Sequence, residues 1–248
     1  MPVRLKKYKI ILILSCLFFI CGCATVYNPA TQRKEFIFID TASEVSLGLD
    51  MDREIGKEFE LLEDFKMLSR LNSIGSKVAL SSDRQDVTYT FKIIKDDTLN
   101  AFAIPGGYVY VNSGLLKRSD DNELACVLGH EIGHIAARHS VKRLQANLGY
   151  QLLIAIAQGA TKEAEVLRAL NVTYNVVALG YSRQDEFLAD KLAVKYSKAS
   201  GFNPYGMVNF FRKLEAEKKP GVELVFLSSH PPVKDRITAV EKEILNDD

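Results

Sequence analysis

Residues 125–136 read A-C-V-L-G-H-E-I-G-H-I-A, an apolar, helix-favouring run that contains the pattern H-E-x-x-H. On an α-helix, residues four apart share one face with Cβ atoms about 5–6 Å apart, so His130 and His134 can point two imidazoles at one metal ion. Glu131 follows the first histidine and can reach a water molecule beside the metal without ligating the metal. Zn²⁺ suits this set because it binds neutral imidazole and keeps one position open for water in catalytic sites. A motif this short also arises by chance, so the other segments decide the interpretation.

The composition bounds the fold and excludes one class of partner. The chain has 248 residues, 47% of them hydrophobic, which is enough for one sizeable core or for a tight pair of subdomains. Its 32 basic and 31 acidic residues nearly balance. Because nucleic-acid-binding proteins carry strongly basic surfaces, we expect no nucleic-acid partner.

The N-terminal segment is typical of a secretory signal peptide. Four basic residues precede an apolar run from Ile10 to Ile20, which is short for a transmembrane helix. The run ends I-C-G-C at residues 20–23 and resembles the bacterial lipoprotein processing box, in which Cys23 receives the lipid and becomes the mature N-terminus. Ala24 follows in place of aspartate, which resembles the signal for transfer to the outer membrane. The alternative is an uncleaved signal anchor. With either, we expect the domain on the periplasmic side of the bacterial cell envelope, attached to a membrane.

The cysteines predict no disulfide framework. Removal of residues 1–22 leaves Cys23 and Cys126, and a lipid on Cys23 would leave Cys126 without a disulfide partner. Cys126 stands in the apolar part of the motif helix, where we expect a buried small hydrophobic residue.

The segment before the motif predicts two helices and a small sheet. Ser43 can cap a first helix, and apolar residues at helical spacing predict a second helix over residues 64–80. Residues 88–95 predict a strand, and residues 100–112 predict a hairpin that turns at P-G-G. The second strand of this hairpin has two interpretations: an ordinary strand, or an edge strand beside the metal to which an extended peptide could add. The residues of that candidate substrate strand are Tyr108, Val109, Tyr110, Val111 and Asn112.

The helix that carries the motif has a clear start. Asp120 as N-cap with Glu123 three residues later resembles a capping box, and we expect the helix to continue to about Ala146. On such a helix His139 lies about 140° around from His134 and faces away from the metal, so we predict it on the surface. The longer pattern with a third histidine is absent, so a third ligand must come from elsewhere in the chain.

Two acids further along the chain are candidates for the site. Glu186 and Asp190 are four residues apart on the next predicted helix, on a face that continues as an apolar stripe. Acids turned towards a core need partners, and a metal with a ligating histidine supplies both. Glu186 would then bind zinc, and Asp190 would accept the outer N–H of His130 or His134 and so fix the histidine tautomer. The alternative is an exposed acidic helix start.

The segment S-S-H-P-P-V-K-D-R-I at residues 228–237 holds the last candidates. Its double proline stiffens the loop and predicts the first turn of a final helix. His230 is either a surface residue or a group that reaches the metal or the oxyanion of a transition state, with Arg236 about one and a half turns further on.

Four segments in this order resemble one known family, the zinc metallopeptidases that include HtpX, BepA, LoiP and the CAAX prenyl proteases. They are N-A-F-A-I-P-G-G-Y-V-Y-V-N-S-G-L at 100–115, E-L-A-C-V-L-G-H-E-I-G-H at 123–134, S-R-Q-D-E-F-L-A-D at 182–190 and S-H-P-P-V-K-D-R-I at 229–237. By size and lipoprotein box the chain is most similar to the short periplasmic lipoproteins of that family, such as LoiP.

The resemblance implies a mainly α gluzincin-type fold with a small β-sheet (α+β). It implies His130, His134 and Glu186 as ligands of one catalytic Zn²⁺ and Glu131 as the catalytic base. It also implies that His230 can approach the zinc and hold the enzyme latent.

These features together predict a domain organisation and a function. We expect a lipoprotein signal peptide over residues 1–22, a tether over 23–42 and a zinc metallopeptidase domain over 43–248. The expected activity is cleavage of unfolded or misassembled envelope proteins, bound as extended polypeptides, with other envelope proteins as further candidate partners. The zinc, with His230 or Arg236, would stabilise the oxyanion. The rival is a lipoprotein chaperone or assembly factor that keeps the zinc and does not cleave.

Overall fold

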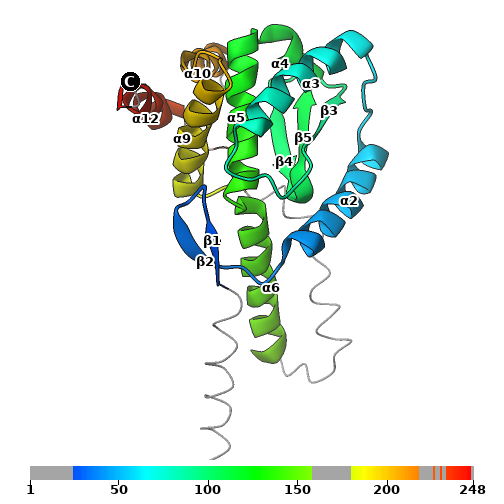
Figure 1. The fold of residues 1–248 in the computed structure, drawn as a ribbon. Helices are drawn as coiled ribbons and strands as arrows, with labels where there is room; N and C mark the ends of the chain where they lie inside the picture. The colour runs from blue at the N-terminus through cyan, green and yellow to red at the C-terminus, as the bar shows by residue number, and fades with distance from the viewer. Residues whose placement is uncertain (1–24, 158–179, 218–225, 227–229, 231–232, 247–248) are drawn as a thin grey trace, which may run out of the picture.

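Helix α5 (Asp121–Ala136), which carries the H-E-x-x-H pattern, runs through the middle of the fold (Figure 1). The structure is a computed structural model and describes residues 25–157, 180–217, 226, 230 and 233–246. Within these residues, α5 packs against helices and against a small sheet, and every residue of α5 from Glu123 onwards is buried. The described part of the chain is mainly helical with two small sheets, which confirms the predicted fold class.

Side-chain caps start the helices that matter for the site, and the cap predicted at Asp120 is confirmed. Helices α5 and α9 (Arg183–Ala199) both begin with capping boxes, on Asp120 and Ser182. Helix α3 (Phe65–Leu80) begins after Asp64, whose side chain accepts from the N–H of the first turn. These caps satisfy N–H groups that have no partner within the helix, so each helix starts at a residue that the sequence encodes locally.

The first helix begins two residues before the predicted cap. Helix α2 (Thr41–Glu58) has Asp40 as its N-cap, and Ser43 donates its backbone N–H to the Asp40 carboxylate.

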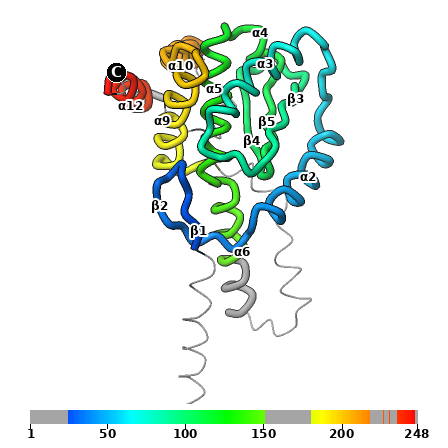
Figure 2. The backbone as a smooth tube through the Cα atoms, in the orientation of Figure 1, coloured from blue at the N-terminus to red at the C-terminus, as the bar shows by residue number. Residues whose placement is uncertain are grey.

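Near the other end of the chain, α12 packs against both α9 and α10 (Figure 2). The bounds of the other described helices are α4 (Ser113–Arg118), α6 (His139–Ala157), α10 (Tyr205–Glu217) and α12 (Val233–Asn246).

The predicted hairpin is present, but its place in the sheet differs from the prediction. Strands β4 (Ala101–Ile104) and β5 (Tyr108–Asn112) pair antiparallel across a 3-10 turn at Pro105–Gly107. Strand β3 (Thr90–Ile94) pairs in parallel with the other side of β5, so the order is β3–β5–β4. The prediction of an edge strand at Tyr108–Asn112 is therefore wrong, because both sides of β5 are occupied. Strand β4 lies at the edge of this sheet and contacts α5.

The predicted tether contributes to the fold. Strands β1 (Thr25–Asn28) and β2 (Arg33–Phe36) form a two-stranded antiparallel hairpin. After β2, the backbone N–H groups of Phe38 and Ile39 donate to Oε1 of Gln145 on α6, at 2.8 and 3.0 Å. Described structure thus begins before residue 43, and part of the predicted tether packs on α6. The predicted signal peptide and Cys23 lie outside the described residues.

The motif helix ends earlier than predicted. Helix α5 stops at Ala136, and Arg138 adopts a left-handed conformation with φ of 55° before α6 starts at His139. The prediction of one helix to about Ala146 is therefore wrong. The Arg138 guanidinium lies 3.7 Å from the buried carboxylate of Glu44, and this contact accompanies the break.

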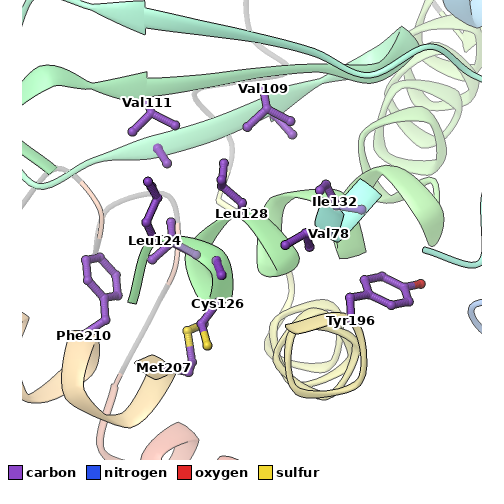
Figure 3. Close-up of a cluster of buried hydrophobic side chains, with 14 of the residues drawn as sticks. Val78, Val109, Val111, Leu124, Cys126, Leu128, Ile132, Tyr196, Met207 and Phe210 are labelled. Atoms are coloured by element: carbon purple, nitrogen blue, oxygen red, sulfur yellow. The ribbon is translucent and has the colours of Figure 1, made fainter. Parts of the chain in front are cut away.

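The core forms around α5 (Figure 3). Cys126 is buried and free, which confirms its prediction, and burial raises the pKa of its thiol to about 12. None of the helices in the described part of the chain combines the length and the apolar character that a transmembrane helix needs. The labelled core side chains come from α3, β5, α5, α9 and α10: Val78, Val109, Val111, Leu124, Cys126, Leu128, Ile132, Tyr196, Met207 and Phe210.

Candidate metal centre

Helix α5 places the two motif histidines side by side. His130 and His134 are both buried, and their Nε2 atoms lie 3.0 Å apart. Their ring centroids are 4.6 Å apart with the ring planes nearly perpendicular. The four-residue spacing on one helix therefore brings both rings to a common point, as the sequence predicts.

Helix α9 brings the predicted acids to the histidines. Both Glu186 and Asp190 are buried, which contradicts the alternative of an exposed acidic helix start. Glu186 Oε1 lies 3.4 Å from His134 Nε2, and Glu186 Oε2 lies 3.6 Å from His130 Nε2. Burial raises the pKa of Glu186, but the charge of the nearby His230 and the close contacts with His134 and His230 outweigh it, so the pKa lies far below its usual value.

Small residues allow the two helices to approach this closely. A Cβ atom on Gly129 would lie 3.1 Å from the Cα atom of Ala193, and one on Gly133 would lie 3.2 Å from the carbonyl oxygen of Ala189. Larger side chains at these positions would push α9 away from α5. The glycines of the motif helix thus set the distance between the histidines and the acids.

His230 lies inside the cluster and not on the surface. It is buried, its Nδ1 atom lies 2.9 Å from Glu186 Oε1, and the same atom lies 3.3 Å from His130 Nε2. One ligand atom from each of His130, His134, Glu186 and His230 lies within 4.8 Å of the others. The surface interpretation of His230 is therefore wrong, and the sequence-predicted ligands form one group.

Each motif histidine also has a partner for its outer nitrogen. Asp190 Oδ1 lies 2.9 Å from Nδ1 of His130, the position that the sequence suggests for this acid. Nδ1 of His134 lies 2.9 Å from Nδ1 of His139, which is buried. The prediction of His139 on the surface is wrong, because the break at Arg138 removes the helical geometry on which that prediction rests. Burial lowers the pKa of His139 to about 4.

Arg236 is buried on the carboxylates and pairs with both of them. Its Nε and Nη2 atoms lie 2.7 Å from the two oxygens of Asp190, and its Nη1 atom lies 2.7 Å from Glu186 Oε2. Burial raises the pKa of Asp190, but the charge and hydrogen bonds of Arg236 outweigh it and lower the pKa below its usual value. The guanidinium thus neutralises part of the negative charge that α9 brings to the site.

Glu131 differs from the other acids because its carboxylate has no hydrogen-bond partner among the described residues. Both of its oxygens are buried, and Oε1 lies 3.6 Å from Nε2 of His230. Burial raises the pKa of Glu131 above its usual value. Burying a carboxylate without a hydrogen-bond partner costs free energy of folding. Such a group is therefore expected to have a catalytic function or to contact a ligand.

The residues present fit a zinc ion. The Asp190 carboxylate only accepts hydrogen bonds, so the outer nitrogen of His130 carries the proton and its Nε2 atom presents a lone pair to the cluster. Nε2 of His134 and an oxygen of Glu186 converge on the same point. Lone pairs that face one another repel unless a cation lies among them. Two imidazole nitrogens and one carboxylate oxygen are a ligand set of catalytic zinc sites.

Comparisons with known proteins show the family of the chain. The sequence model of peptidase family M48 matches residues 67–244, which include every described candidate residue of the centre. The chain is 33% identical over 186 residues to the putative beta-barrel assembly-enhancing protease of Vibrio cholerae, over 68% of this chain and 37% of that protein. It is 31% identical over 170 residues to the metalloprotease LoiP of Escherichia coli, over 67% of this chain and 66% of LoiP.

A eukaryotic relative matches over a longer stretch. The mitochondrial metalloendopeptidase OMA1 of Schizosaccharomyces pombe is 26% identical over 221 residues, which cover 87% of this chain and 65% of OMA1. The chain therefore spans between 37% and 66% of the length of these three relatives. The family match covers well over half of the chain. Because this family match covers most of the chain and the ligand cluster fits a metallopeptidase, we conclude that the chain belongs to peptidase family M48.

Proposed function

We propose that this protein is a zinc-dependent endopeptidase of the bacterial cell envelope that cleaves unfolded or misassembled proteins. One observation carries the proposal: the ligand atoms of His130, His134 and Glu186 converge beside a buried Glu131 carboxylate that has no hydrogen-bond partner among the described residues. A metal site alone would not require Glu131. A peptidase does, because a base must take a proton from the attacking water.

The residues have separate tasks in this proposal. His130, His134 and Glu186 hold the metal, and zinc supplies Lewis acidity that polarises the scissile carbonyl and favours ionisation of water near neutral pH. Glu131 accepts the proton of the attacking water on a carboxylate oxygen and delivers it to the nitrogen of the leaving amine.

The substrate is proposed to add to β4 and not to β5. Strand β4 (Ala101–Ile104) pairs with β5 on one side, lies at the edge of its sheet and contacts α5. An extended peptide that adds there would place its backbone alongside the helix that carries Glu131. Most segments of a folded protein are already paired or packed, whereas an unfolded polypeptide can extend along β4, which supports unfolded polypeptides as substrates.

His230 and Arg236 are proposed to act differently from each other. His230 contacts Glu186 and lies near His130, so it can serve as a fourth ligand that keeps the resting enzyme latent. When His230 is displaced from that position, it can donate to the oxyanion. Arg236 pairs with Asp190 and Glu186, so its proposed role is to position those two carboxylates. A contact between Arg236 and the oxyanion stays a prediction.

The location of the enzyme is proposed from the N-terminal sequence and from the first hairpin. The sequence I-C-G-C supports a lipid on Cys23 and attachment to the outer membrane. Tyr27, Phe36 and Phe38 are each more than half exposed, and Tyr27 follows Cys23 by only four residues, at most about 14 Å of chain. Aromatic side chains favour the membrane interface, so the hairpin suits a position at the lipid surface. Incorporation of labelled palmitate by the wild type, and by a Cys23→Ala variant as control, tests the anchor.

The function is tested with the full-length protein in detergent, loaded with zinc and incubated with unfolded casein. The Glu131→Gln variant should keep the zinc and lose cleavage, because it preserves the shape of the side chain and removes the base. Casein fragments at equal rates from both proteins would contradict the proposed mechanism. Casein that is bound by both proteins and cleaved by neither, nor by a His230→Ala variant in which the latent state is relieved, would favour the rival chaperone function.

A further inference from the structure

His139 stands where the chain leaves the motif helix, and its position depends on the break at Arg138. The left-handed Arg138 separates α5 from α6, and His139 is the first residue of α6. Its ring centroid lies 5.0 Å from that of His134, with the ring planes 70° apart. A ring that would face away on a continuous helix therefore points back to the metal centre.

The contacts of His139 link the protein surface to His134. Nδ1 of His139 lies 2.9 Å from Nδ1 of His134, and Nε2 of His139 lies 3.3 Å from Oδ1 of Asp185. The side chain of Asp185 is 31% exposed, whereas the two histidines are buried. The chain of contacts thus runs Asp185, His139, His134 and then the ligand cluster.

The contacts of His139 indicate which ring nitrogen of each histidine carries the proton. The negative charge of the Asp185 carboxylate lies 3.3 Å from Nε2 of His139 and favours a proton on that nitrogen over a lone pair. In a neutral ring the other nitrogen, Nδ1, is then an acceptor, and the proton in the contact with His134 belongs to His134. His134 is therefore protonated on Nδ1, and its Nε2 lone pair faces the cluster, as metal binding requires.

The two motif histidines are thus oriented by different groups. Nδ1 of His130 meets the Asp190 carboxylate directly, and Arg236 balances the charge of that carboxylate. For His134 an uncharged imidazole takes this place, and the negative charge of Asp185 lies one ring further out. This arrangement orients the second histidine without another buried negative charge beside Glu186.

We propose that His139 is a positioning residue that holds His134 in its metal-binding tautomer, with Asp185 fixing the direction of the hydrogen bonds. The proposal rests on the proposed zinc site and adds to it a residue that contacts neither metal nor substrate. The outer partners of metal-binding histidines commonly change metal affinity about 10–100-fold when they are removed.

Two substitutions separate this role from a structural one. Asn at position 139 carries an amide oxygen near the place of Nδ1, whereas Gln carries its amide group near the place of Nε2. His139→Asn should therefore bind zinc nearly as tightly as the wild type, and His139→Gln should lose about 10–100-fold in competition with a chromophoric chelator. The control is Gln145→Leu, a buried position on the same helix that binds the backbone after β2. It should lower thermal stability and leave zinc affinity unchanged.

The tautomer itself is read by NMR. The protein contains four histidines, so long-range proton–nitrogen spectra of the zinc-loaded, ¹⁵N-labelled protein resolve every ring. We expect the His134 ring to carry its proton on Nδ1 and the His139 ring to carry its proton on Nε2. Equal zinc affinity for wild type, His139→Asn and His139→Gln, or a His139 ring protonated on Nδ1, would overturn the proposal. Failure of the wild type to bind zinc would instead refute the metal site, and with it the function on which the proposal rests.

Discussion

The Arg236→Met variant should lose a large part of the protein's stability, because the arginine lies between two buried carboxylates. Its guanidinium lies 2.7 Å from two oxygens of Asp190 and from one oxygen of Glu186. The Cζ atom of Arg236 also lies 4.7 Å from the centre of the Phe211 ring. Methionine has a similar length and can keep the packing on Phe211, so the substitution removes mainly the charge and the donors.

The magnitude follows from the burial of both acids. Removing one partner of a buried ion pair costs about 3–5 kcal/mol, because the other charge is left uncompensated. Asp190 would keep the contact with His130 at 2.9 Å, and Glu186 would keep its histidine contacts, so the lower half of that range is the better expectation. With a urea dependence of about 2 kcal/mol per molar, the unfolding midpoint should fall by about 1.5–2 M.

Urea unfolding of the metal-free protein, followed by circular dichroism, measures this effect. The matched control is Arg212→Met, which removes an exposed ion pair with Glu241 at 3.2 Å that also joins α10 to α12. Exposed pairs contribute about 0.2–1 kcal/mol, so the control should shift the midpoint by about 0.5 M or less. If Arg236→Met shifts the midpoint no further than the control, the buried ion network does not stabilise the fold as argued.

Three other perturbations have defined outcomes. His230→Ala should free a position in the cluster and increase the initial rate of casein cleavage, since His230 Nδ1 lies 2.9 Å from Glu186. An unchanged rate would contradict latency, and a fall would leave His230 only its role at the oxyanion. Gly48→Ala should destabilise the protein by about 2 kcal/mol in urea unfolding: a Cβ there would lie 2.1 Å from the carbonyl oxygen of Pro105, which costs about 3 kcal/mol and outweighs the gain of about 1 kcal/mol in helix propensity. Equal stability of that variant would contradict the close packing of α2 on the hairpin turn. Chelation of the metal should lower the melting temperature in calorimetry, because zinc at 100 times its Kd stabilises the folded state by about 2.7 kcal/mol, and re-added zinc should restore it. An unchanged melting temperature would argue against a site in the folded core.

The parts of the fold that depend on neighbouring residues could be predicted from the sequence. The caps at Asp64, Asp120 and Ser182 act within one helical turn, and the structure has helices that begin at all three. The convergence of the motif histidines depends only on the four-residue spacing within α5. The burial of Glu186 also follows from a local pattern, because it lies on the face that continues as an apolar stripe.

The rest depends on contacts between distant segments. Arg138 carries no local signal for a left-handed conformation, since glycine is the usual residue there, and its contact is with Glu44 on the distant helix α2. The prediction of His139 on the surface fails for this reason, because the break at Arg138 turns its ring into the core. The strand order is equally non-local, because β5 becomes central only when β3 pairs in parallel on its free side. The pairing of Arg236 with Asp190 joins two helices 46 residues apart in the sequence.

The central claim is that one zinc ion binds among the motif histidines and Glu186, and anomalous X-ray scattering tests it most directly. Crystals of the zinc-loaded protein would be measured on both sides of the zinc absorption edge. We predict a single anomalous peak about 2.0–2.1 Å from Nε2 of both His130 and His134, and at a similar distance from a carboxylate oxygen of Glu186. A map without a peak among these atoms, or with its strongest peak at a different group of residues, would contradict the account.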